Sequence, residues 1–81
     1  MVIKKYKIVE VEWLDAQSGF GQAMEIKDVI DWDPIITYSV GYLIGKNKNG
    51  IILGFMLFGD DMVKHNQLIP LGMIRKVRHL K

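Results

Sequence analysis

Two apolar runs separated by a short polar turn dominate the second half of the chain. Residues 39–44 (SVGYLI) and 51–58 (IILGFMLF) flank the turn Lys46-Asn47-Lys48-Asn49-Gly50. Apolar runs joined through Asn-Gly predict a β-hairpin, with Asn49-Gly50 supplying the positive φ of the turn. The second run is apolar at almost every position, which predicts a central strand or a curved strand whose outer face is covered.

Other segments predict three more strands and one helix. Alternating residues predict a half-buried strand, and apolar residues at spacings of three and four predict a helix that Asp33-Pro34 ends. A single 3₁₀ turn is expected at Leu71–Ile74. The expected strands are 7–13, 35–44, 51–58, 63–69 and 76–80, and the expected helix is 22–32. This order predicts a mainly β protein: a small five-stranded SH3-like or Sm-like barrel with one short helix between strands 1 and 2.

Composition narrows the class of protein. The 81 residues are expected to form a single domain, they include no cysteine, and 49% of them are hydrophobic. No apolar run approaches the ~18 residues of a membrane span, and no secretion signal is visible at the N-terminus. We therefore expect a cytoplasmic protein whose apolar excess is absorbed by a full core, by self-association or by a ligand groove.

Charge is unevenly distributed along the chain. Seven of the nine acidic residues lie between Glu10 and Asp33, whereas basic residues gather near both ends, at 4–7 and 75–81. Pairing of the first and last strands would join these ends into one basic patch. The patch either protects an exposed strand edge, as lysine does in many sheets, or binds an anion, for which Arg75 is the candidate.

No set of residues predicts catalysis. His65 and His79 have no partner at metal-ligand spacing, no phosphate-binding loop is present, and nothing ties a histidine to Ser18 or Ser39. We expect no enzyme activity, no metal and no cofactor.

A binding cluster is better supported. Trp13, Asp15, Ser18 and Phe20 lie within eight residues, at a strand end and in the following loop. Aromatic rings can stack on nucleobases, Asp and Ser can read a polar edge, and the backbone at Gly19 can approach an anion. Trp13 shares a strand face with valines, so a place in the core is the alternative. The same ambiguity applies to Tyr42.

Three motifs resemble a widespread family of small phage-encoded proteins. They are Val11-x-Trp13-x-Asp15-Ala16-x-Ser18, the run 39–44 and Ile69-Pro70. This family is similar to the viral nucleotide sponges, which sequester cyclic-oligonucleotide signals and so blunt CBASS-type immunity.

The resemblance implies a non-catalytic binder of a cyclic di- or trinucleotide that forms a homo-oligomer in the cytoplasm of an infected bacterial cell. The residues that match the motifs are Trp13, Asp15, Ser18, Ser39, Gly41 and Pro70. Phe20 and Tyr42 stand where the family commonly has tryptophan, so the flat ring is kept while the specificity can differ.

Two other functions fit the same sequence. One is an Sm-like or SH3-like binder of single-stranded nucleic acid, with affinity that rises with oligonucleotide length and falls steeply with salt. The other is a protein-interaction module or inhibitor acting on a host protein through an exposed apolar patch.

Overall fold

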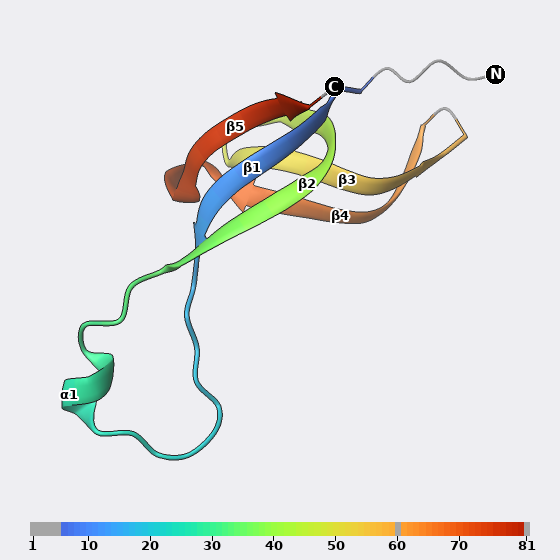
Figure 1. The fold of residues 1–81 in the computed structure, drawn as a ribbon. Coiled ribbons are helices and arrows are strands. Elements are labelled where there is room, and N and C mark those ends of the chain that lie inside the picture. The colour runs from blue at the N-terminus through green and yellow to red at the C-terminus, as the bar shows by residue number, and fades with distance from the viewer. Residues whose placement is uncertain (1–5, 60, 81) are drawn as a thin grey trace.

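The computed structural model describes residues 6–59 and 61–80, and within these the chain is mainly β (Figure 1). Lys4, Lys5 and Lys81, which belong to the predicted basic ends, lie outside the described residues. The elements in chain order are β1 (Ile8–Asp15), α1 (Ile26–Val29), β2 (Ile35–Lys46), β3 (Gly50–Phe58), β4 (Met62–Pro70), the 3₁₀ turn η1 (Leu71–Met73) and β5 (Ile74–Leu80).

The five strands form one open antiparallel sheet in the order β4-β3-β2-β1-β5. The predicted pairing of the first and last strands is confirmed, because Ile8 lies opposite Leu80 and Val11 opposite Val77. Strands β4 and β5 are the two edges. The mainly β class, the number of strands and the position of the helix between strands 1 and 2 are therefore as predicted.

One hydrophobic core joins strands that are not neighbours in the sheet. It consists of Val9, Val11, Trp13, Ile51, Leu53 and Ile69. The first three belong to β1 and the others to β3 and β4, with β2 in between. The sheet must therefore curl so that β1 and β3 face the same interior. Register shifts in the β1–β5 and β2–β3 pairs are of the kind that increases local twist.

The strand 51–58 is only partly the covered strand that its composition predicts. Ile51, Leu53 and Gly54 are buried, but Phe55 and Phe58 are exposed, because the far half of the β3–β4 hairpin runs beyond the core. The apolar composition of this strand did not show at which residue its buried part ends.

The predicted helix is much shorter than expected. It covers four residues in place of 22–32, its N-cap Glu25 makes no side-chain capping bond, and none of its residues is buried. A short helix without a packed face is not stabilised along its length. No helix among the described residues is long and apolar enough to cross a membrane.

The prediction of positive φ at Asn49-Gly50 is wrong, since Gly59 and His65 are the described residues that have it. The turn is held by Asn47, whose Oδ1 accepts hydrogen bonds from the N–H groups of Asn49 (2.8 Å) and Gly50 (3.1 Å). Gly50 is required for another reason: a Cβ there would collide with the backbone carbonyl of Ile69 on β4.

Residues 16–34, which we call the arm, extend away from the sheet between β1 and β2 (Figure 1). They carry α1 and make the molecule long, with extents of 57 × 24 × 23 Å. The radius of gyration is 16.4 Å, whereas a compact chain of this length has about 12 Å. The sheet thus forms a small body from which the arm projects.

Candidate functional site

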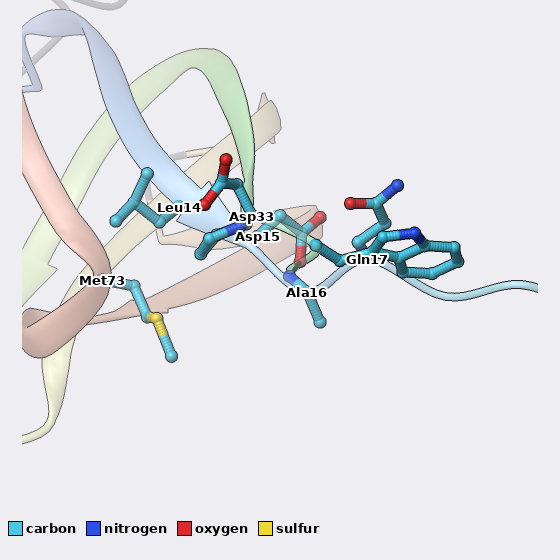
Figure 2. A pocket seen from close by; sticks show the side chains of 8 residues that line it. Leu14, Asp15, Ala16, Gln17, Asp33 and Met73 are labelled. Atoms are coloured by element: carbon cyan, nitrogen blue, oxygen red, sulfur yellow. Dashed lines mark hydrogen bonds between the residues drawn. The ribbon is translucent and has the colours of Figure 1, made fainter. Parts of the chain in front are cut away.

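A hollow of about 280 Å³ lies where the arm joins the sheet (Figure 2). It is lined by Leu14, Asp15, Ala16, Gln17, Trp32, Asp33, Pro34 and Met73. Two carboxylates and one amide thus share a small space with an indole and several apolar side chains.

Strand register explains why these residues meet. Asp15, the last residue of β1, lies directly opposite Ile35, the first residue of β2. The two ends of the arm are therefore next to each other at the edge of the β1–β2 pair. Trp13 lies opposite Ile74, and this pairing brings the preceding turn η1 with Met73 to the same end of β1. In Figure 2, Met73 stands apart from Asp15, Ala16 and Gln17, which follow the chain as it leaves β1. The carboxylate of Asp15 accepts a hydrogen bond from the N–H of Ala16 at 2.8 Å.

The indole of Trp32 is supported by the backbone of the arm. A Cβ on Gly19 would come within 3.2 Å of Cη2 of Trp32, so the glycine lets the ring lie close to the chain. The indole nevertheless remains 36% exposed. A flat ligand therefore has an aromatic surface available at the hollow.

The charge of the side chains that line the hollow determines which ligands the hollow can accept. Asp15 and Asp33 are acceptors when ionised, and no basic side chain is among the lining residues. A phosphate would be repelled here, whereas amino and ring N–H groups would be accepted. The hollow is thus suited to a flat, apolar group with a donor-bearing edge.

Trp13 lies in the core and not at this hollow. Its side chain is 9% exposed, and its Nε1–H donates a hydrogen bond to Oγ of Ser39 at 3.0 Å. Gly41, two residues along β2, is covered by Phe55: a Cβ there would lie 3.1 Å from the phenylalanine ring. The motif residues Trp13, Ser39 and Gly41 therefore share one face of the β1–β2 pair, the face that lines the interior.

The other predicted residues are dispersed. Tyr42 is half-buried opposite Ile8, and Pro70 is exposed at the end of β4. Ser18 and Phe20 lie on the arm, where the phenylalanine ring is 95% exposed. Among the predicted ligand-binding residues, Asp15 lines the hollow and Gly19 supports one of its walls. The binding roles predicted for the rest stay predictions.

Arg75 belongs to an ion-pair network on β1 and β5. Its Nε is 3.7 Å from a carboxylate oxygen of Glu12. Arg78 donates to the same carboxylate at 2.7 Å and to Glu10 at 2.9 Å. The hydrogen bond from Arg78, followed by the positive charges of Arg78, Arg75 and Lys76, lowers the pKa of Glu12 against the opposing effect of desolvation. Two basic side chains of the predicted patch, Arg75 and Arg78, therefore lie beside carboxylates.

Sequence reasoning missed most of the hollow, including Gln17, Trp32, Asp33 and Met73. The available signal was an aromatic and an acidic side chain immediately before Pro34. Trp32 was interpreted as the end of a helix. Only the pairing of Asp15 with Ile35 shows that both ends of the arm leave the sheet at the same place.

Comparison with known proteins gives no indication of function, so any functional assignment rests on the geometry of the hollow. No family model, no curated protein and no solved structure matches the chain significantly.

Proposed function

We propose that this protein is a non-catalytic binder that sequesters a cyclic di- or trinucleotide immune signal in the cytoplasm of a phage-infected bacterial cell. We further propose that the curled sheet serves as an SH3-like or Sm-like barrel scaffold. The observation that carries the proposal is the hollow at the base of the arm, which Trp32, 36% exposed, lines together with two carboxylates. The cyclic nature of the ligand rests on the resemblance carried by residues 11–18, 39–44 and 69–70.

The hollow would hold one base of the ligand. Asp15 and Asp33 accept from amino and ring N–H donors such as those of guanine, adenine and cytosine. Trp32 supplies the stacking surface, and base–aromatic stacking contributes about 1–3 kcal/mol. Met73 and Leu14 supply apolar contact.

The phosphates would lie outside the hollow. Arg75 is two residues beyond Met73, and its side chain is 49% exposed. At 3.7 Å its Nε–Glu12 contact is longer than a hydrogen bond, so the guanidinium retains donors for an anion. Arg75 is therefore the residue that we propose for contact with the phosphates.

Calorimetric titration with cyclic di- and trinucleotides tests the proposal. Binding by the wild-type protein and a loss of about 1–3 kcal/mol in Trp32→Ala are expected. Phe20→Ala is the matched control, since it removes an exposed ring of the same arm that does not line the hollow. Equal losses in both variants, or no binding by the wild type, would contradict the placement of the base.

A protein-interaction module acting on a host protein is the second candidate, favoured by the exposed apolar side chains of the arm, including Phe20, Ile26 and Ile30. A single-stranded nucleic-acid binder has less support, because Arg78 is already engaged with Glu10 and Glu12. Affinity that grows with oligonucleotide length and falls steeply with salt would identify it.

A further inference from the structure

The hollow between the arm and the sheet has room for one nucleobase of the proposed ligand. Its volume is about 280 Å³, close to the lower limit of about 300 Å³ for small-molecule sites. A cyclic dinucleotide therefore places a single nucleobase in the hollow, and its phosphates and second nucleobase stay outside. Selectivity at this site depends on how that one nucleobase meets the side chains that line the hollow.

The indole of Trp32 distinguishes purines from pyrimidines. It is 36% exposed and lines the hollow together with Leu14 and Met73. Stacking removes apolar area from water, and a bicyclic purine covers more of an indole than a single ring does. Stacking therefore favours guanine and adenine over cytosine and uracil. The polar edges of the two purines then have to separate them.

Asp33 presents a carboxylate with both oxygens available. It makes no hydrogen bond or ion pair with the part of the chain that the structure describes. Asp15, beside it in Figure 2, already accepts a hydrogen bond from the N–H of Ala16 at 2.8 Å. The two carboxylates reach one hollow because Asp15 pairs with Ile35, two residues after Asp33. A carboxylate with both oxygens available can accept two parallel hydrogen bonds.

Guanine is the common nucleobase with two neighbouring donors on its Watson–Crick edge, the ring N1–H and the 2-amino group. Adenine and cytosine each place one amino group beside a ring nitrogen that accepts, and uracil places its one N–H between two carbonyls. Against these edges the second oxygen of a carboxylate would face a lone pair, which is repulsive. The carbonyl O6 of guanine lies next to its two donors, and the amide of Gln17 on the lining can donate to it.

We propose that the hollow selects guanine, with the carboxylate of Asp33 accepting from N1–H and the 2-amino group while the ring stacks on Trp32. The second N–H of the amino group has a further acceptor on the lining, the carboxylate of Asp15. This inference rests on the proposed function and narrows the ligand to a cyclic nucleotide that contains at least one guanine.

Calorimetric titration of the wild-type protein with three cyclic dinucleotides tests the selectivity. One contains guanine, one adenine and one hypoxanthine, which keeps N1–H and O6 and lacks the 2-amino group. The guanine ligand should bind about 5- to 150-fold more tightly than the adenine ligand, as a bidentate pair does against the wrong base. The hypoxanthine ligand should lie in between. Equal affinity for the guanine ligand and either of the others would overturn the inference and leave the proposed function intact.

Asp33→Asn replaces an acceptor by a donor and should reverse the preference, because an amide offers the donor and the acceptor that the edge of adenine requires. The guanine ligand should lose about 5- to 150-fold in affinity, whereas the adenine ligand should not be weakened. An equal change for both ligands would mean that only the charge matters, and this would overturn the inference.

Asp31→Asn is the matched control, since it removes the same charge from the same arm at a residue that does not line the hollow. It should leave the ratio of the two affinities unchanged. Both aspartates are exposed and lie outside the core, and circular dichroism checks that both variants fold.

A separate measurement distinguishes failure of this inference from failure of the proposed function. If no cyclic dinucleotide binds, guanosine and adenosine monophosphates are titrated while NMR follows the indole N–H of Trp32. A response to the guanine nucleotide that Asp33→Asn removes would support the guanine site and reject the cyclic ligand. No response to either nucleotide would overturn both proposals.

Discussion

The hydrogen bond between Trp13 and Ser39 joins the two strands from which the arm emerges. The indole is almost fully buried, so its N–H has to find its partner inside the protein, and Ser39 provides it at 3.0 Å. The presence of this pair is explained by folding alone, without any contact to a ligand.

Ser39→Ala should destabilise the protein by about 1–3 kcal/mol, because a buried donor is left without its acceptor. Urea unfolding measures the loss. Ser18→Ala, on the exposed arm, is the control and should leave the unfolding midpoint unchanged. If the two variants unfold alike, the buried hydrogen bond contributes nothing to stability.

The ion pairs of Glu12 make stability depend on pH. Its pKa lies below the ordinary value of 4.5, first because it accepts a hydrogen bond from Arg78. The folded state therefore binds this proton less readily than the unfolded state. The stabilisation is complete above the unfolded pKa and is lost as the pH falls through the folded pKa.

Glu12→Gln should accordingly flatten the fall of melting temperature on acidification below about pH 4.5. Scanning calorimetry of both proteins over this range measures the difference. Glu25→Gln on the arm, outside the network, should keep the wild-type profile. A profile of Glu12→Gln that matches the wild type would assign acid sensitivity to other carboxylates.

At the scale of the elements, the β2–β3 turn depends on close contact between backbones. A Cβ at Gly50 would collide with the carbonyl of Ile69, and neither strand can shift without breaking the β3–β4 pairing. Gly50→Ala should therefore cost about 1–3 kcal/mol in stability, as overpacking generally does. Gly45→Ala, where a Cβ meets nothing within 4 Å, is the matched control in thermal unfolding. Equal melting temperatures for the two variants would show that the turn can relax.

The strands were predictable from sequence because their signals are local. Alternation in 7–13 and the apolar runs around the β2–β3 turn are local patterns that mark the strands, and no strand end differs from its prediction by more than two residues. The length of the helix was overestimated, because the spacing of apolar residues shows that a helix would have an apolar face. It does not show whether another element packs on that face. The hollow was missed for a related reason: Trp32 and Met73 are brought together by register between strands, which no local pattern encodes.

At the scale of the whole molecule, the body should fold without the arm. All six core residues lie outside residues 16–34, and Asp15 and Ile35 are already paired. Replacing the arm by a two-residue Asn-Gly turn should keep the protein folded, with a radius of gyration near 11 Å for a compact chain of about 64 residues. X-ray scattering measures the radius of gyration, and the dispersion of NMR chemical shifts shows whether the chain is folded. The shortened protein should no longer bind the nucleotide. A shortened chain that is unfolded would mean that the arm supports the sheet.

The pairing of β1 with β5 also has a consequence for how the chain reaches its native state. Ile8 meets Leu80, so the strand that supplies half of the core gains its second neighbour from the opposite end of the sequence. Contacts between residues so distant along the chain slow folding, into the range of about milliseconds to seconds for β proteins. Until β5 arrives, one side of β1 presents an unpaired row of backbone groups. The time for which this side of β1 stays unpaired, more than the stability of the finished sheet, would decide how much of the protein avoids pairing with another copy when many copies are made at once.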